Sequence, residues 1–289
     1  MDRRARQLLI LAVGCAALFG ILLAAAYHWG PGHSLDERGL IGFVSVDRGL
    51  VEDITARLAQ LGDPFEVALI ALGLSAVAAL RGRPRTVVVV LLLIAATSVS
   101  SQLLKALFAH SPSGPLGTSL FRAEESFPSG HATAAMALAL AGVLVAPRRA
   151  RPAAALVGSL LALGVGASVV ARGWHYPSDV LGGYLLAAVW ALVLVALLCE
   201  ADRRYPAAAR LSVTTMARVS DRIAARGASA AAVLGAVGAL LLAIVTLAAD
   251  PTAVAVFVRD HTAALVVAGG VAAAAVALPA ALASLVPRG

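Results

Sequence analysis

Long apolar runs separated by short polar segments dominate the sequence. A helix that crosses a bilayer needs about 20 apolar residues. Eight runs approach or reach that length, at residues 8–27, 66–80, 87–108, 131–147, 153–171, 179–199, 229–248 and 263–286. The second run is short and extends upstream if Pro64 begins the helix. The pattern predicts an all-α fold: a polytopic membrane helical bundle of about eight transmembrane helices.

The composition agrees with this pattern. Hydrophobic residues make up 60% of the chain and charged residues 13%, whereas an ordinary soluble domain has about 45–50% and about 25%. These values exclude a disordered chain, a coiled coil and a disulfide-stapled secreted domain, and leave too little polar surface to cover a soluble globule. The net charge of +7 does not indicate a nucleic-acid partner, because the basic residues form short clusters between apolar runs.

The charges also predict an orientation. Arginines gather at residues 3–6, 81–85, 148–151 and 203–226, whereas all six histidines and most acidic residues fall in the intervening connections. Because positive connections stay in the cytoplasm, we expect a multi-pass cell-membrane protein with both termini cytoplasmic. Residues 1–27 also fit a cleaved signal peptide, which would leave the downstream orientation unchanged.

The spacing of the spans divides the chain into three parts. Residues 1–200 hold six spans and an outer-face loop at 28–65, in which Leu50 to Leu61 has a helical pattern. Residues 201–228 form a basic cytoplasmic linker typical of an amphipathic surface helix. Residues 229–289 hold two further spans, whose small residues permit close packing either within the monomer or in a homo-oligomer.

Two connections on the expected outer face end in a polar turn that opens a membrane helix. The first is Pro128-Ser129-Gly130 and the second ends at Ser178. A helix start offers unpaired backbone N–H groups and the positive end of the helix dipole, so it favours anions. Helix capping explains the serines equally well, but it does not explain a histidine, His131 or His175, at each turn.

The side chains at these turns predict phosphoryl transfer through a histidine. Asp179, four residues after His175, can fix the imidazole tautomer and raise its nucleophilicity. His131 can protonate a leaving group, and Lys105, the single lysine of the chain, adds positive charge at the outer end of the third span. No metal or other cofactor is required. Two histidines and one aspartate could also bind zinc, although nearby basic residues would repel a cation.

These motifs resemble those of the type 2 phosphatidic acid phosphatase family, the membrane relatives of vanadium haloperoxidases. The family motifs are Lys, six residues, Arg-Pro; Pro-Ser-Gly-His; and Ser-Arg, five residues, His, three residues, Asp. The second motif is intact at 128–131, and so is the His-to-Asp half of the third at 175–179. The resemblance covers about 66–200 and implies a six-span core at about 8–200.

The resemblance implies a role for each matching residue. His175 would be the nucleophile that forms a phosphohistidine, Asp179 would orient it, and His131 would protonate the leaving group. Ser129 and Gly130 would bind phosphate oxygens, and Lys105 would neutralise their charge.

Two arginines of the family pattern are missing. Pro112 stands at the arginine position of the first motif and Val169 at that of the third. Arg172 lies three residues closer to His175, which on a helix amounts to a rotation of about 60° and a shift of about 4.5 Å. A guanidinium can cover that displacement, so we expect Arg172 to replace the arginine of the third motif. Arg122 is the candidate for the first motif.

The predicted function is a metal-independent lipid phosphate or diphosphate phosphatase at the outer membrane face. A phosphate ester whose tail stays in the bilayer would reach the site laterally. Three substrates are candidates. A polyprenyl diphosphate is preferred, and phosphatidic acid and phosphatidylglycerol phosphate are the alternatives. An acceptor-dependent phosphotransferase and a non-catalytic membrane scaffold remain as alternatives, because each lost anion-binding donor typically costs about 10²–10³ in rate. A transporter is disfavoured, since no span carries a deep charge.

Overall fold

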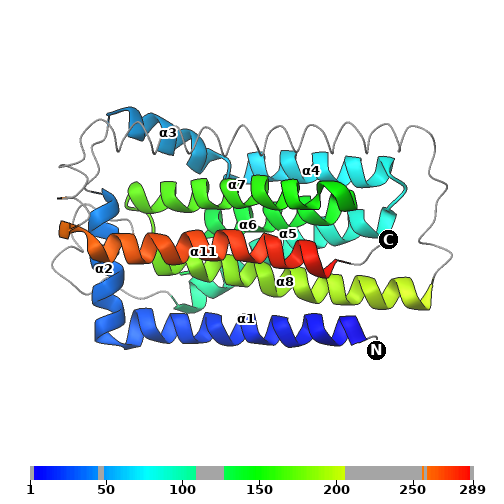
Figure 1. The fold of residues 1–289 in the computed structure, drawn as a ribbon, viewed down its shortest axis with the longest axis horizontal. Helices are drawn as coiled ribbons and strands as arrows, with labels where there is room; N and C mark the ends of the chain where they lie inside the picture. Colours follow the sequence, from blue (N-terminus) through cyan, green and yellow to red (C-terminus); the bar gives the residue numbers. More distant parts are fainter. Residues whose placement is uncertain (1–2, 45–48, 109–126, 206–255, 257–258, 287–289) are drawn as a thin grey trace.

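The computed structural model describes residues 3–44, 49–108, 127–205, 256 and 259–286, and these ranges contain helices and no strand. The helices are α1 (Arg3–His28), α2 (Gly30–Val44), α3 (Gly49–Gln60), α4 (Pro64–Leu80), α5 (Pro84–Phe108), α6 (Gly130–Val145), the 3-10 turn η2 (Arg148–Ala150), α7 (Arg151–Ala171), α8 (Pro177–Arg204) and α11 (Thr262–Leu285) (Figure 1). The all-α expectation is confirmed. The predicted span at 229–248 and most of the linker at 201–228 lie outside the described residues.

The other expected spans coincide with α1, α4, α5, α6, α7, α8 and α11. Five of the described helices are long and apolar enough to cross a membrane. A sixth span results if α3 and α4, which meet at a bend of 56°, are counted together, and α6 is a shorter apolar helix. Large apolar side chains on the outer helices face outward, including Val13, Leu69 and Leu80, as a lipid-facing surface requires. The protein is a multi-pass membrane protein.

Helix α6 forms the centre of the bundle. Nearly all of its residues are buried, and it packs against α4, α5, α7, α8 and α11. Two arginines of the α4–α5 turn cap its end: Arg81 Nη1 donates to the carbonyl of Val145, and Arg83 Nη1 donates to that of Leu144, each at 3.0 Å. Cations at this end satisfy the last carbonyls and complement the helix dipole. The C-terminal end of α6 is therefore held by the α4–α5 turn.

The two motif turns lie at the same end of the bundle. Helices α5 and α7 end there, and α6 and α8 begin there (Figure 1). The start of α1 and the end of α11 lie at the opposite end. This arrangement matches the alternation of connections that the charge pattern predicts. Which end faces the cytoplasm remains a prediction.

The segment at 28–65 differs from the loop that we expected. Helix α3 matches the predicted helical piece, but α2 was not anticipated. Helix α2 lies across the end of the bundle and packs against α1, α7, α8 and α11. Four glycines and a proline make its sequence a poor helix former. Tertiary contacts override that preference, because Leu40 is buried and Gly39 and Gly42 lie against side chains of α11.

Two adjacent glycines in α8, Gly182 and Gly183, allow α8 to pack closely against the start of α6. A Cβ atom on Gly183 would lie 2.8 Å from the carbonyl oxygen of Ser129 and 2.9 Å from the backbone nitrogen of Thr133. A Cβ atom on Gly182 would lie 2.6 Å from the ring of Phe127. Because a backbone neighbour cannot rotate away, only glycine allows this spacing at residue 183. The close packing brings the start of α6 against the start of α8.

Candidate active site

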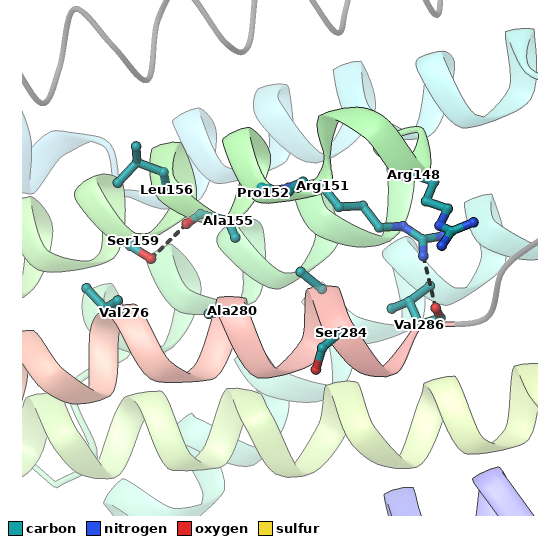
Figure 2. Close-up of a pocket in the computed structure, with 11 residues that line it drawn as sticks. Arg148, Arg151, Pro152, Ala155, Leu156, Ser159, Val276, Ala280, Ser284 and Val286 are labelled. Carbon is teal, nitrogen blue, oxygen red and sulfur yellow. Dashed lines mark hydrogen bonds between the residues drawn. The ribbon is translucent and has the colours of Figure 1, made fainter.

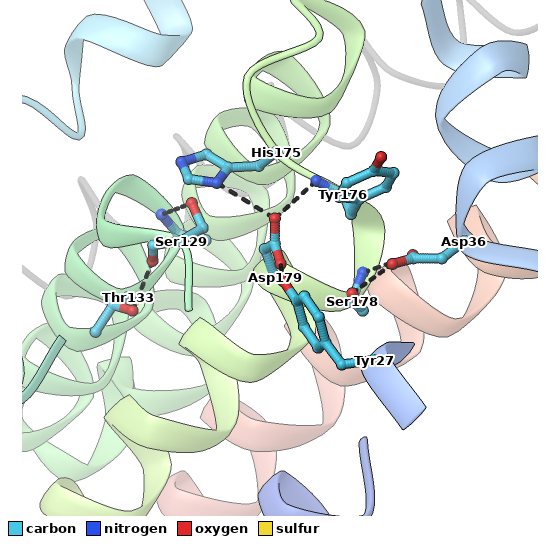
Figure 3. A network of polar contacts seen from close by, with 9 residues as sticks. Tyr27, Asp36, Ser129, Thr133, His175, Tyr176, Ser178 and Asp179 are labelled. Carbon is cyan, nitrogen blue, oxygen red and sulfur yellow. Dashed lines mark hydrogen bonds and ion pairs between the residues drawn. The ribbon is translucent and has the colours of Figure 1, made fainter. Parts of the chain in front are cut away.

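His175 and Asp179 lie where α7 turns into α8. Gly173, with φ of 71°, supplies the left-handed residue that reverses the chain after α7. Nδ1 of His175 lies 3.5 Å from Oδ2 of Asp179 (Figure 3). The histidine is 8% exposed and the aspartate is fully buried. The sequence-predicted pair is therefore brought together in a shielded position, at a separation that can shorten when a ligand binds.

Asp179 is anchored through both carboxylate oxygens and through its backbone. Oδ1 accepts a hydrogen bond from the Tyr27 hydroxyl at 3.1 Å, and Oδ2 accepts one from the backbone N–H of Tyr176 at 2.9 Å. The carbonyl of Asp179 accepts a third, at 2.9 Å, from the backbone N–H of Ser129. The carboxylate is thereby held toward Nδ1 of His175. Nε2 is then the ring nitrogen that points away from Asp179.

Ser129 caps α6, as the capping interpretation predicts. Its Oγ accepts from the backbone N–H of Ala132 at 3.3 Å, and its carbonyl accepts from the backbone N–H and the hydroxyl of Thr133. The N–H of Ser129 is used by Asp179, so this residue offers a ligand only its hydroxyl. The backbone N–H groups of Gly130 and His131 follow in the first helical turn, where no carbonyl of the helix can accept them.

Lys105 lies beside the same turn. A Cβ atom placed on Gly130 would lie 3.7 Å from Nζ of Lys105 and 3.9 Å from Oγ of Ser101. The structure thus brings an ammonium group from α5 next to the start of α6. Positive charge and first-turn N–H groups together make this turn suited to an anion.

His131 has a carboxylate partner that the sequence did not reveal. Nε2 of His131 lies 2.9 Å from Oδ1 of Asp63, the residue that precedes α4. A Cβ on Gly62 would lie 2.9 Å from the His131 side chain, so a glycine is needed for the corner between α3 and α4 to approach this closely. The carboxylate of Asp63 favours the protonated imidazole, which is the form that donates a proton, whereas burial of the ring and the charges of His175 and Lys105 oppose it.

Arg172 and His131 both lie beside the ring of Trp174. It follows the last residue of α7, and its guanidinium sits 4.7 Å from the ring centroid of Trp174. The Trp174 and His131 ring centroids are 5.7 Å apart. Nε of Arg172 is buried and has no hydrogen-bond partner among the described residues. A buried donor left unsatisfied is costly, so an anionic ligand at this position would be favoured. Arg122 lies outside the described residues.

Ser178 differs from the expectation of a helix cap. Tyr176 is the residue that precedes the first turn of α8, and Ser178 lies inside the helix. The backbone N–H of Ser178 donates to Oδ1 of Asp36 at 3.0 Å, and its hydroxyl donates to Oδ2 at 2.5 Å (Figure 3). Asp36 is 8% exposed. Burial raises the pKa of Asp36 to about 7, the charge of Asp179 adds to this, and the bonds from Ser178 only partly oppose it.

The acidic and histidine side chains do not form a metal cluster in the described part of the chain. No group of three or more His, Cys, Asp or Glu residues there converges to hold an ion. His175 and His131 each have their own carboxylate, Asp179 and Asp63, which is a paired arrangement of acids and bases.

Comparison with known proteins supports the class and the family that the motifs indicate. The fold and site are those of a multi-pass helical membrane protein with a histidine–aspartate pair beside a turn suited to an anion. Residues 77–203 match the sequence model of the PAP2 superfamily. This match, over residues 77–203, supports the type 2 phosphatidic acid phosphatase family, which the motifs also indicate.

One solved structure supports the fold. The chain is similar to the crystal structure described as the first transmembrane PAP2 type phosphatidylglycerolphosphate phosphatase from Bacillus subtilis, with a TM-score of 0.54 and 22% sequence identity. The match covers 65% of this chain and 95% of that chain. No curated protein matches the sequence.

The raised pKa of Asp36 predicts a pH dependence of stability. The folded state holds this proton more tightly than the unfolded chain, so the stability that it adds is present at low pH and is lost as pH rises through about 7. We expect the melting temperature of the wild type to fall relative to that of Asp36→Asn between about pH 5 and about pH 8. Asp53→Asn, which removes an exposed carboxylate, should follow the wild type. Parallel curves for the wild type and Asp36→Asn would contradict the prediction.

Proposed function

We propose that the protein is a lipid phosphate or diphosphate phosphatase that works through a phosphohistidine, without a metal ion. The match of residues 77–203 to the PAP2 superfamily supports a membrane phosphatase. The observation that carries the mechanism is the buried His175, whose Nδ1 faces the anchored carboxylate of Asp179. This arrangement leaves Nε2 for attack and supplies a negative charge that stabilises the ring as it becomes cationic.

The reaction proceeds in two displacements at phosphorus. In the first, Nε2 of His175 attacks, the bond to the leaving oxygen breaks, and that oxygen takes a proton from His131. In the second, His131 accepts a proton from water, the water oxygen attacks the phosphohistidine, and the nitrogen–phosphorus bond breaks. Inorganic phosphate leaves and both histidines return to their starting states. Asp63 supports His131 as the proton donor, because its carboxylate favours the imidazolium.

The phosphate oxygens are bound by donors from three elements. The N–H groups of Gly130 and His131 open α6, and the Ser129 hydroxyl lies in the same turn. Lys105 adds an ammonium group from α5. Arg172 adds a guanidinium whose buried Nε has no acceptor in the described part of the chain. Such donors contribute most when they are aimed at the charge that develops in the transition state.

The substrate is a phosphate ester with a hydrophobic tail, and it enters from the bilayer at the outer face. Large apolar side chains on the outer helices face outward, and the arginine-rich connections at 81–85 and 148–151 lie at the other end of the bundle. By the positive-inside rule, this arrangement favours the outer face for the histidines. A polyprenyl diphosphate remains the first choice. Phosphatidic acid and phosphatidylglycerol phosphate share its chemistry, and the solved structure similar to this chain is named for the latter.

Phosphate release tests this proposal directly. The detergent-purified full chain, assayed in EDTA on a panel of these lipid phosphates, should release inorganic phosphate. His175→Ala should abolish the release, because the nucleophile is lost. His28→Ala removes an exposed histidine at the same end of the bundle and should keep wild-type activity. Turnover that requires added metal, turnover that persists in His175→Ala, or no turnover by folded protein would overturn the proposal. Release only with an added acceptor would indicate a phosphotransferase.

The role of His131 predicts a dependence on the leaving group. An alkoxide needs a proton to depart, whereas a nitrophenolate does not. His131→Ala should lose about 10²–10⁴ in kcat/KM, which reports the first displacement, on an alkyl phosphate and much less on a p-nitrophenyl phosphate ester. Asp63→Asn should show the same bias with a smaller loss, and Asp53→Asn should show none. An equal loss on both substrates would contradict the assignment of His131 as the acid.

Arg172 is expected to replace the missing arginine of the third motif. Arg172→Ala should lower kcat by about 10²–10³, the usual effect of one lost transition-state donor. Arg172→Lys should recover part of this loss, because it restores the charge without the planar fork. Arg38→Ala, which removes an exposed arginine from α2, is the control. Activity of Arg172→Ala near that of the wild type would show that Arg172 does not bind phosphate.

A further inference from the structure

A pocket of about 610 Å³ lies between α7 and α11, at the end of the bundle opposite the histidines (Figure 2). The first turns of α7 line one side of the pocket, and the second half of α11 lines the other side. Residues 151–171 separate the two sites, because Arg151 begins α7 and His175 follows its end. The volume falls within the range of about 300–1,000 Å³ that is typical of small-molecule sites.

One end of this pocket is strongly positive. Arg148 and Arg151 line it, and their side chains lie together beside Val286 in Figure 2. Nη1 of the buried Arg151 donates to the carbonyl of Val286 at 2.9 Å, which fixes the guanidinium at the end of α11. Arg81 is close enough for its charge to act on Arg151. The described residues that line the pocket include no carboxylate. Gathered like charges repel in a medium of low dielectric constant, so an anion is favoured here.

The remainder of the pocket is apolar. Ala155 and Leu156 of α7 face Val276 and Ala280 of α11. Small side chains on both helices leave room along the direction in which a lipid chain runs. A ligand that matches the whole pocket therefore carries a negative headgroup at the arginines and a hydrocarbon chain between the helices. Guanidinium groups bind phosphate oxygens through two parallel hydrogen bonds.

We propose that this pocket binds one anionic phospholipid of the bilayer. Its phosphate lies between Arg148 and Arg151, and one acyl chain lies between α7 and α11. Basic pockets between transmembrane helices at the cytoplasmic surface are suited to such headgroups. The site is separate from the histidines, so it does not depend on the proposed catalytic function. The bound lipid would connect α11 to the central helices.

Native mass spectrometry of the full chain tests this site. Protein released from nanodiscs of mixed phosphatidylglycerol and phosphatidylcholine should retain one phosphatidylglycerol. Arg148→Gln should weaken retention about tenfold, as expected for the loss of a charge-assisted contact. Arg149→Gln is the matched control, because Arg149 is an exposed neighbour that does not line the pocket. Equal retention by the two variants would overturn the proposal.

A second variant tests the apolar part independently of charge. Ala280→Phe places a ring in the groove from an exposed position on α11, and it should expel the lipid while the protein stays folded. Inorganic phosphate, added in place of lipid, should not raise the melting temperature as phosphatidylglycerol does, because it lacks the acyl chain. Retention by Ala280→Phe, equal retention of phosphatidylcholine, or equal stabilisation by phosphate would each contradict a site for an anionic phospholipid.

Discussion

The active site depends on the contact between the start of α8 and the start of α6. The carbonyl of Asp179 accepts the N–H of Ser129, while the carboxylate of the same residue faces His175. One buried residue therefore positions both the proposed nucleophile and the turn proposed to bind phosphate. The contact exists because Gly183 lets the two helix starts approach to a distance that any Cβ would prevent. A shift of either helix would separate the histidine from the turn proposed to hold its substrate.

Residues that precede the PAP2 match also hold polar groups of the candidate site in place. Tyr27, Asp36 and Asp63 all precede residue 77, where the match begins. Tyr27 binds Asp179, Asp36 binds Ser178, and Asp63 binds His131. Asp179, Ser178 and His131 thus each have a partner from the first third of the chain. The N-terminal helices act as part of the site because they fix the orientation of its buried polar groups, which would otherwise be unsatisfied.

The sequence predicted the features that depend on local pattern. Apolar runs of bilayer length gave the described spans, and the Pro-Ser-Gly-His turn gave the start of α6, because helix length and capping are set by neighbouring residues. Helix α2 could not be predicted in this way, since contacts with distant helices stabilise it against its own glycines. The partners of the motif residues were also hidden. Tyr27 and Asp179 are 152 residues apart, and Asp63 and His131 are 68 apart, so no spacing rule connects them.

In the proposed reaction, phosphate passes through His175. The most direct measurement is a rapid quench of the full-length protein with a lipid phosphate labelled at phosphorus, followed by mass spectrometry of the phosphorylated peptide. A phosphohistidine intermediate predicts an acid-labile, base-stable phosphate on His175 that forms within one turnover and before free phosphate is released. Phosphate on another residue, or turnover with no phosphorylated protein at any time, would contradict it.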